Sequence, residues 1–164
     1  MIQLIVSDLD GTLLKNHEAI HPDNLRALKK AAEMGVQFAV ASGRSAAACS
    51  VLLEESGWAD AFVIGTNGCE LMEKPFGAML SQHFMQKEAA RAVLEVGLHH
   101  GLECCLYTKD AIVYSNDNML KNQNTSYAAQ EFVRKMRLAG VRVEAGQEVA
   151  LEAVDWSPMK VYCV

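Results

Sequence analysis

The alternation of element types in the first 68 residues is the feature that most constrains the fold. Short apolar runs typical of buried strands occur three times, at 2–6, 36–41 and 61–64. Helix patterns fill the two gaps, at 22–34 and 46–55. Strands that alternate with helices in this way form parallel sheets through right-handed crossovers. The pattern therefore predicts an α/β fold with a Rossmann-like parallel sheet, helices on both of its faces, and a first strand buried on both faces.

The pattern changes after residue 68. Hairpins are predicted over 69–82 and 103–114, helices over 87–100 and 128–138, a polar loop over 116–126, and strands over 149–154 and 159–164. These elements mix helices and strands without the earlier alternation. We therefore expect two domains, an α/β core over residues 1–84 and an α+β domain over residues 85–164.

Composition excludes several classes of protein. Half of the residues are hydrophobic, 21% are charged and the net charge is −5, which is typical of a globular protein and argues against nucleic-acid binding. The chain has no basic run for an anionic membrane and no apolar stretch that would span one. Its five cysteines show no metal-binding spacing and are expected to be buried and reduced. We therefore expect a cytoplasmic protein.

Polar loops follow each of the three predicted parallel strands. They read Asp-Leu-Asp-Gly-Thr from Asp8, Ser-Gly-Arg-Ser from Ser42 and Gly-Thr-Asn-Gly from Gly65. Ligands of open parallel sheets bind beyond the carboxyl ends of the strands, where such loops meet. The sequence therefore predicts one site at this edge.

Asp8 and Asp10 are the candidate catalytic pair. Two residues apart in an extended segment, they project on the same side. Two close carboxylates repel each other, and a divalent cation such as Mg²⁺ relieves that repulsion. One carboxylate can then attack phosphorus while the other exchanges protons with the leaving group and water. Gly11 lets the loop turn tightly and present N–H groups to a phosphate.

The other two loops offer groups for an anion, each with an alternative role. The Ser42 hydroxyl, the amides after it and a helix N-terminus favour a phosphate. The alternative for Ser42 is a plain helix N-cap, a role compatible with phosphate binding. Arg44 either reaches the substrate or braces the loop. Asn67 either orients the phosphate or is a turn residue that tolerates a left-handed backbone.

These loops resemble those of a known family. The run Asp-Leu-Asp-Gly-Thr-Leu-Leu from Asp8 is similar to the signature of haloacid dehalogenase-like hydrolases, and Ala-Ser-Gly-Arg and Thr-Asn-Gly resemble loops of their Cof-type branch. The resemblance implies that Asp8 is the nucleophile, that Asp10 is the general acid/base, and that Mg²⁺ binds the Asp8 carboxylate and the Asp10 carbonyl. It also implies that residues 85–164 form a cap. The phosphate- and substrate-binding residues expected at the site are Leu9, Gly11, Ser42, Gly43, Arg44 and Asn67.

The resemblance also implies two elements that have no match in this sequence, a lysine near the nucleophile and a late acidic loop. Lys160 falls in a strand pattern of the second domain, and neither Asp117 nor Asp155 sits in such a loop. We therefore expect a chain truncated at its C-terminus. Two functions follow: a magnesium-dependent phosphatase (or phosphomutase) for small phosphorylated metabolites, and a catalytically impaired chain that binds phosphate or a partner. The sequence specifies neither the substrate nor the oligomeric state.

Overall fold

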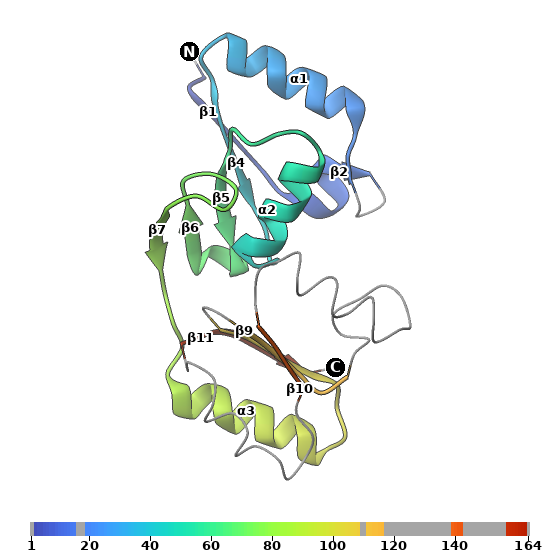
Figure 1. Ribbon diagram of the computed structural model, residues 1–164, viewed down its shortest axis with the longest axis vertical. Coiled ribbons are helices and arrows are strands. Elements are labelled where there is room, and N and C mark those ends of the chain that lie inside the picture. Colours follow the sequence, from blue (N-terminus) through green and yellow to red (C-terminus); the bar gives the residue numbers. More distant parts are fainter. Residues whose placement is uncertain (1, 16–18, 109–110, 117–138, 143–156, 164) are drawn as a thin grey trace. The chain divides into compact units, whose positions relative to one another are not determined.

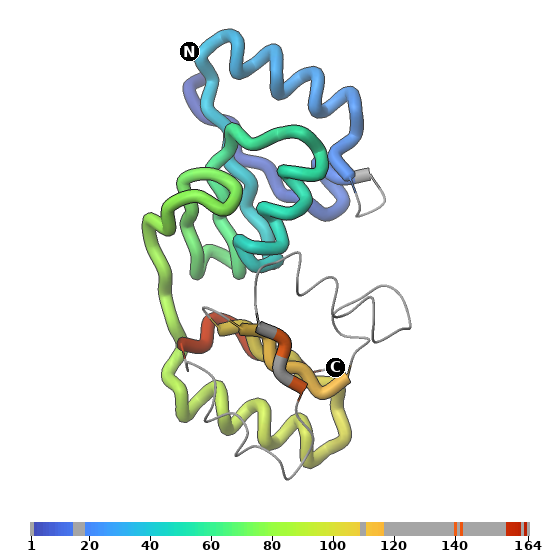
Figure 2. The backbone as a smooth tube through the Cα atoms, in the orientation of Figure 1, coloured from blue at the N-terminus to red at the C-terminus, as the bar shows by residue number. Residues whose placement is uncertain are grey.

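The computed structural model of the chain describes residues 2–15, 19–108, 111–116, 139–142 and 157–163. The chain divides into two compact units, Met1–His83 and Phe84–Val164. Figure 1 labels their helices and strands, and Figure 2 traces the backbone from blue to red. The predicted helix at 128–138 and strand at 149–154 lie outside the described residues, as does most of the predicted loop at 116–126.

The first unit contains a five-stranded sheet in the order β1-β4-β5-β6-β7. Its strands are β1 (Leu4–Ser7), β4 (Gln37–Ala41), β5 (Phe62–Gly65), β6 (Glu70–Met72) and β7 (Met79–Gln82). The first three are parallel, and β6 and β7 add an antiparallel hairpin. A small two-stranded sheet, β2 (Leu14–Lys15) with β3 (Ala19–Ile20), was not predicted. The predicted α/β class, with its parallel sheet followed by a hairpin, is confirmed.

Two helices connect the parallel strands, and both begin where local chemistry favours it. Helix α1 (Pro22–Glu33) has proline in its first turn, and the His21 Nδ1 atom accepts a hydrogen bond from the Asp23 N–H at 3.2 Å. Helix α2 (Ala46–Glu55) is capped by Ser45, whose Oγ accepts from the Ala48 N–H at 3.2 Å. Both helices match their predicted positions.

One hydrophobic core lies between these helices and the sheet. It includes Phe38 and Val40 of β4 and Val63 of β5, together with Leu28 of α1 and Leu53 of α2. Both crossovers move in the same direction across the sheet, so right-handed connections place α1 and α2 on the same face. This shared core agrees with that placement, so the predicted helices on the second face of the sheet are not found among the described residues.

The prediction that the first strand is buried on both faces is wrong for the described structure. Leu4 is 48% exposed and Val6 is 53% exposed, although both are apolar. They pair in register with Gln37 and Ala39, whose side chains face away from the Phe38–Val40 side of β4. Strand β1 is also an edge strand of the described sheet, so it lacks a neighbour on one side as well as a covering helix on this face.

The second unit packs helix α3 (Lys87–His99) against a four-stranded sheet in the order β10-β9-β8-β11. The strands are β8 (Cys104–Thr108), β9 (Ala111–Tyr114), β10 (Ala139–Arg142) and β11 (Pro158–Cys163). Leu94 of α3 packs with Leu106 and Val113 in its core. Gly97 permits close contact, because a Cβ atom there would lie 2.4 Å from the sulfurs of Cys104 and Cys163. The predicted hairpin is confirmed, whereas β10 was not predicted.

Candidate active site

The Asp8 loop turns sharply at the carboxyl end of β1. Asp8 is exposed, and its Oδ1 accepts a hydrogen bond from the Leu9 N–H at 2.7 Å. The backbone remains extended at Asp8 and Asp10, and Gly11 then adopts a φ of 73°. A Cβ at Gly11 would meet no atom within 4 Å, so the positive φ, and not lack of space, is the reason for glycine. Asp8 thus presents an open carboxylate beyond the strand.

Asp10 is held by Arg44, which comes from the loop after β4. The Arg44 Nε donates to Asp10 Oδ2 at 2.8 Å, and Nη2 donates to Oδ1 at 2.6 Å. Both side chains are about one-third exposed, at 29% for Arg44 and 34% for Asp10. A two-bond guanidinium–carboxylate pair fixes orientation as well as charge. Of the two roles considered for Arg44, the structure shows the bracing contact.

The second and third loops are joined through their backbones. The Ser42 N–H donates to the Ile64 carbonyl at 2.9 Å, the Asn67 N–H to the Ser42 carbonyl at 3.0 Å, and the Thr66 N–H to the Arg44 carbonyl at 2.7 Å. The structure therefore brings Asp10, Ser42, Arg44 and Asn67 into one connected network. Asn67 has a φ of 57°, which is the left-handed turn geometry considered for it.

The polar groups at the start of α2 are occupied by the chain itself. The Ser42 Oγ accepts from the Arg44 N–H at 3.2 Å and is not the helix cap, since Ser45 has that role. The Ala46 N–H donates to Glu70 Oε2 at 2.9 Å, and the Ala48 N–H donates to Ser45. Contrary to expectation, these two amides of the α2 N-terminus are not open to a bound anion.

Glu70 was missed by the sequence analysis. It is 5% exposed at the start of β6, and its Oε2 also accepts from the Thr66 hydroxyl at 2.5 Å. A buried carboxylate of this kind requires partners to offset its desolvation. The signal in the sequence was a charged residue placed between the apolar residues of a predicted strand, Cys69 and Leu71.

The residues present fit a magnesium ion in part. Asp8 offers a hard carboxylate oxygen, whereas both oxygens of Asp10 are bound by Arg44, which leaves the Asp10 carbonyl as its contribution. The described residues contain no cluster of three or more His, Cys, Asp or Glu side chains suited to a metal. Mg²⁺ is commonly held by one or two protein carboxylates together with waters and substrate phosphate. Asp8 and the Asp10 carbonyl fit such a site.

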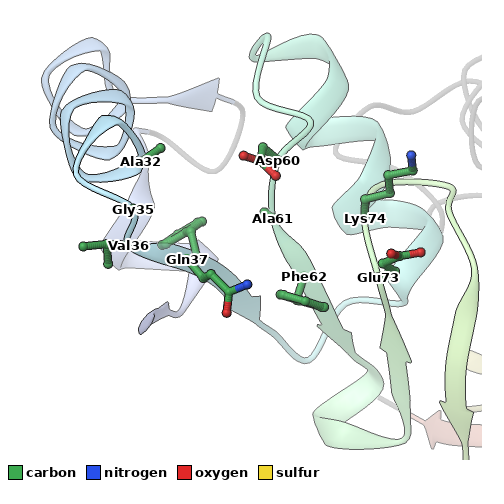
Figure 3. Close-up of a pocket in the computed structure, with 10 residues that line it drawn as sticks. Ala32, Gly35, Val36, Gln37, Asp60, Ala61, Phe62, Glu73 and Lys74 are labelled. Atoms are coloured by element: carbon green, nitrogen blue, oxygen red, sulfur yellow. The ribbon is translucent and has the colours of Figure 1, made fainter. Parts of the chain in front are cut away.

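A cavity of about 460 Å³ lies at the opposite end of the same sheet. It is lined by residues at the beginnings of β4 and β5 and just after β6, among them Gln37, Phe62, Asp60, Glu73 and Lys74 (Figure 3). None of the predicted site residues lines it.

The cysteines of the described structure are free thiols. Burial raises the pKa of the Cys49 thiol to about 12, although the neighbouring Arg44 guanidinium acts in the other direction. Cys49 lies beneath the second loop, with its Sγ 3.9 Å from the Arg44 carbonyl. A thiol with this pKa is a packing residue and not a nucleophile at neutral pH.

Comparison with known proteins gives named relatives. The chain is 28% identical over 120 residues to 5-amino-6-(5-phospho-D-ribitylamino)uracil phosphatase YwtE of Bacillus subtilis, covering 73% of this chain and 41% of that protein. It is 29% identical over 114 residues to pyridoxal phosphate phosphatase YbhA of Escherichia coli, covering 70% and 42%. The chain thus spans less than half the length of these two relatives.

No helix within the described residues has the length and apolarity needed to cross a membrane.

Solved structures and a family model agree with these relatives. A haloacid dehalogenase-like hydrolase from B. subtilis superposes with a TM-score of 0.73 at 21% identity, covering 99% of this chain and 61% of that one. A likeness at that identity supports the fold. The family model for haloacid dehalogenase-like hydrolases matches residues 5–141, which is most of the chain and includes all three loops. The chain therefore belongs to the haloacid dehalogenase-like hydrolase family.

Proposed function

We propose that this chain carries the nucleophile half of a magnesium-dependent phosphatase that hydrolyses small phosphate monoesters through an aspartyl-phosphate on Asp8. The observation that carries this proposal is the contrast between the two aspartates. Asp8 is open to solvent, whereas Asp10 is fixed by two bonds from Arg44. An attacking group needs access, and a proton-transfer group needs a fixed orientation.

The chemistry assigned to these residues runs in two steps. The Asp8 carboxylate attacks phosphorus, and the ester oxygen leaves with a proton from Asp10. Asp10 then takes a proton from the water that releases phosphate from Asp8. Each Asp10 oxygen accepts one bond from Arg44 and keeps a second lone pair, so the pair can hold the orientation of Asp10 while one oxygen exchanges the proton. Mg²⁺, when bound by Asp8 and the Asp10 carbonyl, neutralises charge on the carboxylate and the phosphoryl group.

The phosphoryl group is assigned to the surrounding loops. We assign to its binding the backbone of Leu9 and Gly11, the Ser42 hydroxyl, Gly43 and Asn67. Arg44 is assigned to Asp10 first, because its described guanidinium bonds are to that carboxylate. The N-terminus of α2 contributes less than a free helix end would, because Glu70 and Ser45 already accept from its amides.

The substrate class is a small phosphorylated metabolite of the cytoplasm. Two relatives are named for phosphate esters of this kind, a phosphoribitylamino-uracil and pyridoxal phosphate. We assign the second unit, residues 84–164, the role of a cap that selects among such esters. The compounds named for the relatives are therefore the first substrates to test.

A second function is favoured by a specific observation. Both oxygens of Asp10 already accept hydrogen bonds from Arg44, and the described residues contain no cluster of three or more metal-binding side chains. Such a chain would bind phosphate or a partner without turning substrate over.

Hydrolysis of p-nitrophenyl phosphate by this chain, with and without Mg²⁺, distinguishes the two functions. Turnover that depends on Mg²⁺ and disappears in Asp8→Asn supports the phosphatase. Saturable phosphate binding without turnover supports the binding protein instead.

A further inference from the structure

We infer that Glu70 is a positioning residue that holds the second and third loops together, and through them orients Arg44 and Asp10. This inference rests on the proposed function of the Asp8–Asp10 site and assigns a role to a residue outside it. Glu70 touches neither aspartate in the described contacts. Its effect would pass through the loops that it joins.

The carboxylate of Glu70 lies where the two loops meet. Its Oε2 accepts from the Ala46 N–H at the start of α2 and from the Thr66 hydroxyl in the third loop. The backbones approach so closely that a Cβ at Gly65 would lie 2.4 Å from the Ala46 nitrogen and 3.0 Å from Glu70 Oε2. One buried oxygen thus joins the two loops where the backbones of Gly65 and Ala46 are in close contact.

The third loop has a backbone that needs such support. Thr66 and Asn67 have φ values of 50° and 57°, and neither is glycine. Two consecutive residues in the left-handed region are costly unless the surroundings hold them there. Thr66 is buried at 2% exposure and donates its hydroxyl to Glu70, so this bond fixes the first of the two residues.

The third loop, which contains Thr66 and Asn67, also supports the second loop, which contains Ser42 and Arg44. The Thr66 N–H donates to the Arg44 carbonyl, and the Asn67 N–H donates to the Ser42 carbonyl. The Arg44 guanidinium in turn makes both bonds to Asp10. A displacement of Thr66 would therefore be transmitted to Arg44 and then to the carboxylate that we assign to proton transfer.

Glu70 also determines the electrostatics of the α2 N-terminus. A carboxylate at a helix N-terminus is favourable because it faces the positive end of the helix dipole. Here Glu70 is that carboxylate, so it already offsets the positive end of the α2 dipole in the absence of a bound phosphate. The helix end serves to position a loop, and it offers a substrate phosphate less than a free helix end would.

The test compares Glu70→Met, Glu70→Gln and the matched control Glu73→Met. Methionine is close to glutamate in size but accepts no comparable hydrogen bond, whereas glutamine keeps an acceptor oxygen without the charge. Glu73 is exposed and lies three residues further along the same segment. A role in positioning predicts the order of loss Glu70→Met, then Glu70→Gln, with Glu73→Met unchanged.

Two measurements report whether the side chains of the candidate site keep their positions in each variant. The first is the Arg44 Nε–H resonance, which reports the Asp10–Arg44 pair. The second is the affinity for beryllofluoride with Mg²⁺, which reports the Asp8 site. We expect Glu70→Met to shift or broaden the Arg44 resonance and to weaken beryllofluoride binding roughly tenfold or more, the factor expected when a hydrogen bond to a charged group is lost.

A merely structural Glu70 would lower the melting temperature and leave both readouts of the folded protein unchanged. A folded Glu70→Met with the wild-type Arg44 resonance and an affinity within about twofold of wild type would overturn the inference. If that variant does not fold, Glu70→Gln and Thr66→Val decide in the same way, because both retain the shape of the side chain. If wild-type protein binds no beryllofluoride, the proposed function fails, and the Arg44 resonance alone decides the role of Glu70.

Discussion

The two ends of the sheet in the first unit differ in what they offer a ligand. At the carboxyl ends of β1, β4 and β5, backbone bonds join the second and third loops, and the Arg44 side chain joins the first loop through Asp10. Glu70 also has fixed partners there. At the opposite end, a cavity of about 460 Å³ is lined by Asp60, Glu73 and Lys74. This cavity is therefore not where those hydrogen-bonded polar groups converge. Strand direction and fixed polar partners are the grounds on which we place the candidate site at the carboxyl ends of the strands.

The largest effect is expected for Asp8→Asn. Loss of the attacking carboxylate should lower magnesium-dependent hydrolysis of p-nitrophenyl phosphate by at least about 10⁴-fold, as for removal of other enzymatic nucleophiles. Asp60→Asn at the cavity end is the matched control and should retain wild-type activity. Equal losses in the two variants would remove the distinction between the ends.

Asp10→Asn should have the next largest effect. The amide retains the shape but cannot exchange the proton, so we expect kcat to fall by about 10²–10⁴-fold. The loss should be smaller for p-nitrophenyl phosphate than for an alkyl phosphate, because nitrophenolate leaves without needing a proton. The same loss for both esters would contradict the role of Asp10 as general acid.

Arg44→Lys separates positioning from substrate binding. Lysine keeps the charge but lacks the planar fork that makes two bonds to Asp10. If Arg44 acts through Asp10, kcat should fall roughly tenfold with little change in KM, which is the loss expected for a charged hydrogen bond. A rise in KM with an unchanged kcat would assign Arg44 to the substrate instead.

Changes at the cavity end should have little effect on activity. Lys74→Ala removes the cavity's only lining cation among the described residues, and Glu73→Gln removes a carboxylate there. Both should leave kcat/KM within about twofold of wild type, the range of ordinary surface substitutions. A larger loss in steady-state assays would show that the cavity takes part in the reaction.

The smallest effect is expected for Cys49, and it concerns stability and solvent access, not activity. It tests only the end of the sheet where the three loops lie. Its folded pKa of about 12 lies above the ordinary value of 9.0, so the folded state keeps a proton that the unfolded state loses. The stability that Cys49 contributes is therefore full below pH 9 and is lost as the pH rises toward 12. Iodoacetamide at pH 8 should alkylate half-buried Cys69 well before Cys49, as read by mass spectrometry. Rapid alkylation of Cys49 would show that the loop above it opens readily.

Local patterns were sufficient to predict much of this structure. Continuous apolar runs predicted β4 and β5, proline predicted the beginning of α1, and a helix pattern from residue 46 predicted α2, because these signals act over a few residues. The capping residue of α2 is Ser45 and not Ser42, which was the predicted candidate. Strand β1 has an equally apolar sequence, yet Leu4 and Val6 are exposed. The sequence of a strand indicates which of its side chains favour burial. Whether they are buried depends on other elements of the chain that pack against the strand.

The residues of the candidate site follow from the sequence, whereas their contacts do not. The positions of Asp8, Asp10, Ser42 and Asn67 follow from strand ends, which the sequence indicates. The bond from Arg44 to Asp10 spans 34 residues, and that from Ala46 to Glu70 spans 24. No local pattern specifies which side chains will meet over such separations, so the bracing role of Arg44 and the presence of Glu70 required the structure.

A titration with beryllofluoride in the presence of Mg²⁺, followed by ¹⁹F NMR, tests the assignment of Asp8 most directly. It requires the nucleophile and the phosphoryl site but no turnover, so it applies to this chain whether or not it is catalytically complete. We predict a saturable bound signal for wild-type protein that requires Mg²⁺, is absent in Asp8→Asn and is retained in Asp60→Asn. A bound signal that survives in Asp8→Asn, or none in the folded wild-type chain, would contradict the assignment of Asp8 as the nucleophile.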